Sequence, residues 1–149
     1  MAGTTVSVVC TDVRPQNVDA PADGLVLGYV IENADGTFQH TIYLRNRICK
    51  DLEQMDTPKN PNMQLNSWDG TAFSPKADFE DGMAVSVLNH EAHHIKDQNG
   101  DEAVVECDAY MSRRAAVQGW GMAEWKQNRL YWGIKHFHSL EPANYRLEC

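Results

Sequence analysis

A run of five residues near the middle of the chain, His90-Glu91-Ala92-His93-His94, has the residue types and spacing of a metal site with its own base. On a helix, side chains four residues apart share a face, so His90 and His94 can direct ring nitrogens at one cation. Glu91 lies about 100° further round, where it can take a proton from a metal-bound water. Zinc lowers the pKa of such a water towards about 7. The run predicts Zn²⁺ as cofactor, His90 and His94 as ligands and Glu91 as the catalytic base.

The surrounding residues favour a helix at this position. Met83, Val87, His90 and His94 recur at spacings of three and four and form one stripe. His93 points away from that stripe, so we expect it to be solvated or hydrogen-bonded rather than a ligand. The alternative interpretation is an exposed helix that carries histidine and glutamate by chance.

A catalytic zinc usually has three protein ligands and one open position, so a third ligand is expected. Glu102 and Glu106 are four residues apart on the next predicted helix and share a face. The turn around 98–100 is expected to fold this helix back antiparallel to the first. Both glutamates then come within reach of the metal, and the spacing leaves the third ligand open between them. For either, an ordinary solvated helix charge is the alternative.

Three further residues are candidates for stabilising an oxyanion. Tyr110 lies two turns beyond Glu102, and His136 and His138 lie on the last predicted helix. A tyrosine or histidine facing the cleft can donate to a tetrahedral intermediate. The alternative for each is a packing or surface role. Trp68-Asp69-Gly70 is interpreted as a lid or as an ordinary loop.

The elements that must position these residues begin with β structure. Strands are expected at 4–10, 25–32 and 37–44, and the last two flank Asn33-Ala34-Asp35-Gly36, a hairpin signal. A short helix is expected over 45–55. The prolines, asparagines and glycine in 57–75 predict a long irregular loop.

The second half of the sequence predicts three helices. The first spans 78–97, with Asp78 or Asp81 as its cap. The second is capped by Asp101 and runs to about 117, and the third covers 122 to about 138. The predicted fold class is therefore α+β, with a small N-terminal sheet, an active-site helix, a ligand helix and a covering helix.

Length and charge bound the remaining classes. The 149 residues predict a single domain over 1–149, and no apolar run approaches the roughly 20 residues of a membrane span. The formal net charge of -8 argues against nucleic acid as the main partner. The expected partner is a peptide or protein substrate, and the sequence does not indicate an oligomeric state.

The four cysteines are widely spaced and form no C-x-x-C pair. This favours two disulfides and an extracytoplasmic or secreted protein, with four reduced cysteines in the cytosol as the alternative. Sequence alone allows three connectivities. Cys107 lies on the predicted ligand helix, and a bond there would stiffen the site, so we predict Cys49–Cys107 and Cys10–Cys149.

The H-E-x-x-H run followed by a glutamate on the next helix resembles the gluzincin class of zincin metallopeptidases. In that class, an acid four residues after the ligand glutamate hydrogen-bonds the first motif histidine. Glu102-Ala103-Val104-Val105-Glu106 is similar to this pattern, with Glu where Asp is usual. The resemblance implies Glu102 as third ligand and Glu106 as the partner of His90.

The chain is also similar to small uncharacterised H-E-x-x-H proteins of actinobacteria, which share Glu102-Ala103 and Glu106-Cys107 after the motif. Together the resemblances imply a minimal zincin-like domain and a zinc metallopeptidase that cleaves an amide bond. The gap between His94 and Glu102 is shorter than in larger gluzincins. The alternative function is a catalytically silent binding or inhibitor module that keeps the metal for stability.

Overall fold

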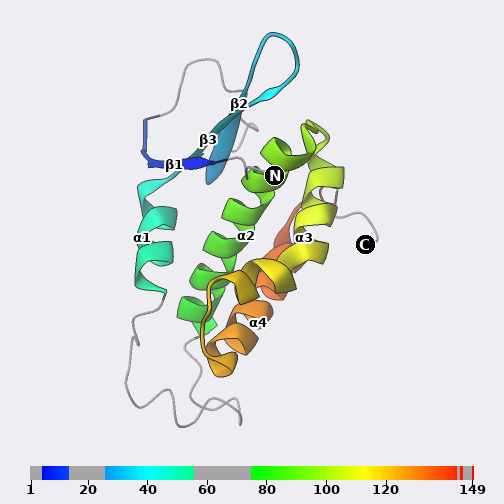
Figure 1. The fold of residues 1–149 in the computed structure, drawn as a ribbon. Helices are drawn as coiled ribbons and strands as arrows, with labels where there is room; N and C mark the ends of the chain where they lie inside the picture. Colours follow the sequence, from blue (N-terminus) through cyan, green and yellow to red (C-terminus); the bar gives the residue numbers. More distant parts are fainter. Residues whose placement is uncertain (1–4, 14–25, 56–74, 144, 146–148) are drawn as a thin grey trace.

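The chain forms a small sheet followed by a helical half, which confirms the predicted α+β class (Figure 1). The structure is a computed structural model and describes residues 5–13, 26–55, 75–143, 145 and 149. The strands are β1 (Ser7–Cys10), β2 (Gly28–Glu32) and β3 (Phe38–Leu44), and the helices are α1 (Asn46–Gln54), α2 (Pro75–Asp97), α3 (Glu102–Gly119) and α4 (Glu124–Leu140). The predicted loop and its Trp68-Asp69-Gly70 stretch lie outside the described residues, except Pro75, which begins α2.

The sheet has β3 at its centre, parallel to β1 and antiparallel to β2. The turn between β2 and β3 is the predicted hairpin. Gly36 has a φ of 81°, a conformation that glycine adopts without a Cβ penalty. The Asn33 N–H donates to the Thr37 carbonyl at 2.7 Å, and Asp35 Oδ1 accepts from the Thr37 N–H at 3.0 Å. Local turn chemistry therefore closes this hairpin as the sequence predicts.

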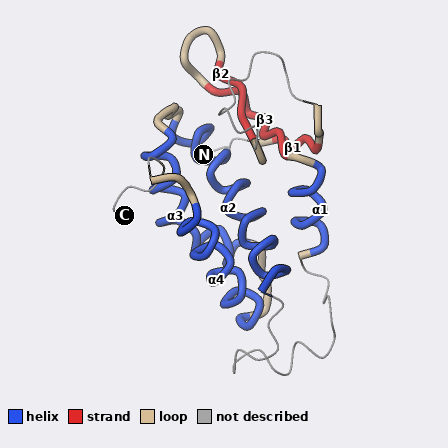
Figure 2. The backbone as a smooth tube through the Cα atoms, turned by 180° about the vertical axis from the view of Figure 1, so that it is seen from behind, coloured by secondary structure: helices blue, strands red, loops and turns tan. Residues whose placement is uncertain are grey.

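Helix α2 is the central element. Both views place α1 on one side of it and α3 and α4 on the other (Figure 1 and Figure 2). One buried cluster joins the sheet and α1 to α2 and comprises Phe38, Ile42, Leu44, Ile48, Cys49, Met83, Ala84, Val87 and Ile95. A second joins α2 to α3 and α4 and comprises Met55, Val85, Val117, Met122, Leu130 and Ile134. Packing on both sides holds α2 as a rigid platform.

Two acidic residues that the sequence predicts as helix caps are instead buried in ion pairs. Helix α2 begins at Pro75, so Asp78 and Asp81 lie inside it and are 2% and 1% exposed. The Arg129 guanidinium donates to both carboxylate oxygens of Asp78, at 2.8 and 2.9 Å. Lys126 Nζ donates to Asp81 Oδ2 at 2.6 Å. The cap prediction is wrong because proline, which suits the first helical turn, starts the helix earlier.

Helices α2 and α4 approach each other closely at two glycines. A Cβ on Gly133 would lie 2.1 Å from the Asp78 carbonyl oxygen. A Cβ on Gly82 would lie 2.4 Å from the Gly133 carbonyl carbon. Neither position has room for a larger residue, so the two glycines set the distance between the helices and with it the reach of Arg129.

The disulfides join Cys10 to Cys49 and Cys107 to Cys149. The predicted pairing is therefore wrong, although the prediction of two disulfides is confirmed. Cys10 pairs with Leu44 in the parallel β1–β3 ladder, and α1 starts directly after β3, which brings Cys49 beside it. Two disulfides are typical of oxidising compartments. Within the described residues, no helix combines the length and apolar character that a membrane crossing requires.

Candidate metal centre

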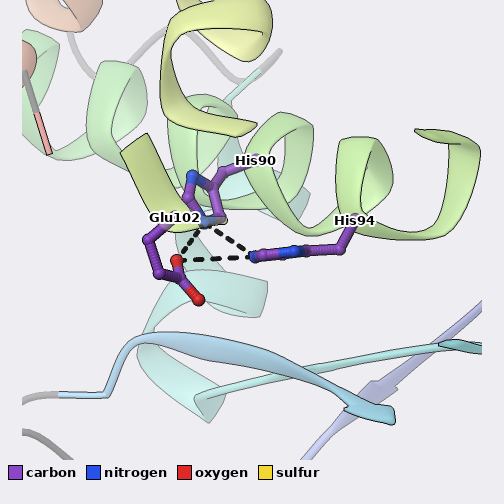
Figure 3. A group of neighbouring side chains, drawn as sticks. All are labelled: His90, His94 and Glu102. Atoms are coloured by element: carbon purple, nitrogen blue, oxygen red, sulfur yellow. Dashed lines mark hydrogen bonds and ion pairs between the residues drawn. The ribbon is translucent and has the colours of Figure 1, made fainter. Parts of the chain in front are cut away.

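Three side chains from two helices direct ligand atoms towards one point (Figure 3). His90 and His94 come from α2, and Glu102 comes from the first turn of α3. His90 Nε2 lies 3.0 Å from Glu102 Oε2 and 3.1 Å from His94 Nε2. The third side of the triangle, from His94 Nε2 to Glu102 Oε2, is 3.5 Å. The structure thus brings together the two motif histidines and one of the two glutamates that the sequence leaves open.

The other nitrogen of each ring faces an oxygen that accepts hydrogen bonds. His94 Nδ1 lies 2.7 Å from the Asn99 carbonyl oxygen, and His90 Nδ1 lies 2.9 Å from Glu106 Oε2. A carbonyl or carboxylate oxygen can only accept, so each Nδ1 carries a hydrogen. In a neutral ring, Nε2 is then left with its lone pair. When both rings are neutral, two imidazole lone pairs and a carboxylate oxygen converge, an arrangement that favours a cation between them.

The electrostatics of the group agree with this arrangement. Burial lowers the pKa of His90, but hydrogen bonds with Glu102 and Glu106 outweigh it and raise the pKa to about 10. Burial raises the pKa of Glu102, but hydrogen bonds from His90 and His94 outweigh it and lower the pKa to about 2. The metal-free group therefore holds a proton at neutral pH, in the place where a metal cation would compete with it.

Glu106 reaches His90 from the opposite side of the ring from Glu102. Its side chain is 5% exposed, whereas that of Glu102 is 49% exposed. Because Glu106 contacts Nδ1 and Glu102 contacts Nε2, the two glutamates cannot both face the point between the histidines. Glu102 forms the side of the group that opens to solvent, and the histidines form the buried side.

The turn between α2 and α3 is held by local and long-range hydrogen bonds. Asp101 caps α3, as predicted, and accepts from the N–H groups of Ala103 and Val104. Gln98 has a φ of 49° at the end of α2, and its Oε1 accepts from the Phe38 N–H at 2.7 Å. These bonds tie the turn to β3 and position both Glu102 and the Asn99 carbonyl that meets His94.

Side-chain hydrogen bonds join α2 to α3, which run antiparallel as the sequence predicts. Asn89 Nδ2 donates to the Ala109 carbonyl at 2.7 Å and to Ser112 Oγ at 3.1 Å. His93 lies 2.8 Å from Ser112 Oγ and, through its other nitrogen, 2.8 Å from Asp97 Oδ2. His93 is thus hydrogen-bonded on both ring nitrogens and lies outside the converging group.

Glu91 is buried against strand β2 and is 7% exposed. Gly28 makes room for it, since a Cβ at this position would lie 3.2 Å from Glu91 Cγ and 2.8 Å from Val87 Cγ1. Burial raises the pKa of Glu91 to about 7. A general base works best when its pKa lies near the working pH. Gly28 was not among the residues predicted from the sequence, although a glycine inside the strand expected at 25–32 is a signal of close approach by a neighbouring group.

The oxyanion candidates lie on the far side of Glu106 or at the surface. Glu106 Oε1 lies 2.9 Å from His138 Nδ1, and the ring of Tyr110 stacks on His138 with centroids 4.0 Å apart. His136 stacks on Trp132 instead. Glu141, which the sequence analysis missed, also contacts His138 Nδ1, at 3.1 Å. Its signal is an acidic residue three positions after His138, at the end of the last expected helix.

No protein-family model, curated protein or solved structure matches this chain. The ligand chemistry of the residues is therefore the basis for assigning a metal. Two imidazole nitrogens and one carboxylate oxygen form a donor set that suits Zn²⁺ and leaves a coordination position open. The described residues could therefore hold a divalent metal ion at this point.

Proposed function

We propose that this protein is a zinc-dependent hydrolase of the metallopeptidase type, which cleaves an amide bond in a peptide or protein. One observation carries the proposal: Nε2 of His90, Nε2 of His94 and a carboxylate oxygen of Glu102 converge, while Nδ1 of each ring faces an acceptor. Partners of this kind fix the tautomer and orientation of metal-binding histidines. The arrangement is the one that a three-ligand zinc site requires.

Each residue of the group then has a role. His90, His94 and Glu102 would hold zinc, whose Lewis acidity polarises a carbonyl and makes water more acidic. Glu91 follows His90 directly, is buried, and lies close enough to the group for the charges of its three residues to act on the Glu91 pKa. Its carboxylate accepts the proton of the attacking water and returns it to the leaving amine. Glu106 and the Asn99 carbonyl keep the two imidazole rings turned towards the metal position.

Three features support an enzyme over a metal-stabilised module. A structural zinc site normally closes with a fourth protein ligand, whereas the group formed by the described residues contains three. The half-exposed side chain of Glu102 leaves one side of the group accessible to water and substrate. A purely structural site needs no general base, whereas burial raises the pKa of Glu91 to about 7, which suits that role.

The decisive test is Glu91→Gln, which keeps the size of the side chain and removes its basicity. We expect the variant to bind zinc like the wild type, because Glu91 is not one of the three converging residues. Hydrolysis should fall by about 10²–10⁴-fold, the usual contribution of a positioned acid–base group. Cleavage of a mixed peptide library and of peptidoglycan fragments, read by mass spectrometry, supplies the assay.

The matched control is Glu53→Gln, the same change at an exposed glutamate on α1. It should leave both zinc content and hydrolysis unchanged. A chelator should abolish the activity, and added zinc should restore it. If fully zinc-loaded wild type cleaves nothing in either panel, the binding or inhibitor module becomes the better interpretation.

A further inference from the structure

A second group of ligand atoms lies on the other side of Glu106. His138 Nδ1 is 2.9 Å from Glu106 Oε1 and 3.1 Å from Glu141 Oε2. The three ligand atoms all lie within 4.8 Å of one another. Glu106 lies on α3 and His138 on α4, and Glu141 is the residue directly after α4. The packing of the two helices, rather than one local segment, therefore creates this group.

The three ligand atoms also suit a metal cation by their type. His138 Nδ1 lies within hydrogen-bond distance of both carboxylate oxygens, so in the metal-free protein it carries a hydrogen that they accept. A divalent cation can take the place of that hydrogen, because an imidazole nitrogen and two carboxylate oxygens are ligands that transition metals accept.

Burial strengthens the attraction of this group for a cation. The side chains of Glu106, His138 and Glu141 are 5%, 14% and 13% exposed. Water therefore screens their charges only weakly, and the effective dielectric constant falls well below that of bulk water. The ring of Tyr110 stacks on His138 and holds the imidazole in place.

We propose that Glu106, His138 and Glu141 bind a second divalent transition-metal cation. This site goes beyond the proposed hydrolase and does not depend on hydrolysis. Glu106 links the two sites, because Oε2 contacts His90 while Oε1 faces the second cation. The second site has one imidazole where the first has two, so it binds Zn²⁺ more weakly. Its carboxylates also accept Mn²⁺.

The test is a calorimetric titration of the full-length, metal-free protein with Zn²⁺ alone. The wild type should bind two equivalents, the second more weakly. His138→Ala should keep the tight equivalent and lose the weak one, and His94→Ala should do the reverse. Glu141→Gln should weaken binding of only the second equivalent, by at least about tenfold. Residues that merely hydrogen-bond a metal ligand contribute roughly 10–100-fold to affinity, and a residue that contacts the metal itself contributes no less.

The matched control is His136→Ala, two residues away on α4 and stacked on Trp132, which should still bind two equivalents. Circular dichroism should show the same helix content in every variant. A wild type that binds one equivalent, lost in His94→Ala and kept in His138→Ala, overturns the second site. One equivalent lost only in His138→Ala supports the second site and removes the first, so the two proposals fail separately.

Discussion

Helix α2 carries two ionic groups that differ in how complete they are. Near its N-terminal end lies the Asp78 group, in which Asp78 and Asp81 meet Arg129 and Lys126 of α4. Arginine and lysine are permanently charged donors at neutral pH. Each of these carboxylates therefore faces a cation that belongs to the protein, and the group requires no ligand.

Near the C-terminal end lies the His90 group, which comprises His90, His94 and Glu102. Here the facing atoms are two imidazole nitrogens and a carboxylate oxygen, so the group has acceptors but no permanent cation of its own. The comparison shows that charge and burial alone do not indicate a metal site. What distinguishes the second group is the orientation of the rings by Asn99 and Glu106.

The largest expected effect is loss of zinc from the His90 group. His94→Ala removes one of two imidazole ligands. We expect zinc affinity to fall by more than the roughly 100-fold that is the upper end for residues that only hydrogen-bond a ligand. After dialysis that removes weakly bound metal, elemental analysis should show one tightly bound zinc in the wild type and its loss in the variant, with helix content retained. His40→Ala, an exposed histidine of β3, is the control. Wild-type protein that binds no zinc would contradict the proposed site.

The next largest effect is expected from a substitution that disrupts the Asp78 group. Arg129→Ala removes the bidentate guanidinium partner of the buried Asp78 carboxylate, and the free energy of unfolding should fall by about 3–5 kcal/mol. The folded fraction should still bind zinc, because no residue of the His90 group changes. Denaturant titration with parallel zinc analysis measures both. Arg47→Ala, which removes a surface ion pair with Glu80, should cost no more than about 1 kcal/mol.

A smaller effect separates the two glutamates of α3. Glu102→Ala should weaken zinc binding more than Glu106→Ala does, because Glu102 faces Nε2 of His90 and Glu106 faces Nδ1. The expected loss for Glu106→Ala is about 10–100-fold, the range for residues that orient a ligand. Competition with a chromogenic chelator gives both affinities. The reverse ranking would make Glu106 the ligand.

The smallest expected effect tests packing next to the Asp78 group without changing any charge. Gly133→Ala puts a Cβ against the Asp78 carbonyl, and the forced shift should cost about 1–3 kcal/mol of unfolding free energy. Gly119→Ala is the control, since a Cβ there meets no atom within 4 Å. Zinc affinity should stay at the wild-type level in both. A large loss of zinc in Gly133→Ala would show that the two ionic groups are coupled.

Local spacing was sufficient to predict several elements. The four-residue step from His90 to His94 predicts a shared helix face, and the structure places both rings there. The turn that ends at Gly36 and the cap at Asp101 were also predictable, because each depends on a few neighbouring residues. In such cases the interacting groups lie within four residues of one another, so backbone geometry alone brings them together.

Only the tertiary structure decided the contacts between distant segments. Cys49 meets Cys10 because β1 pairs with β3, and Asp78 meets Arg129 because α4 crosses α2 at two glycines. These contacts depend on how helices and strands pack, which residue spacing does not encode.

The same distinction applies inside the candidate site. Sequence spacing puts Glu102 and Glu106 on one face of α3, yet it does not say which nitrogen of His90 each one meets. The position of Gly28 beside Glu91 and of Glu141 beside His138 depends on the sheet and on α4 in the same way. The amino-acid sequence alone was sufficient to bring the two histidines and Glu91 together, because one helical turn holds them. The third ligand candidate and the second group of acids were decided by the distance and angle between helices, which the buried residues of both cores set.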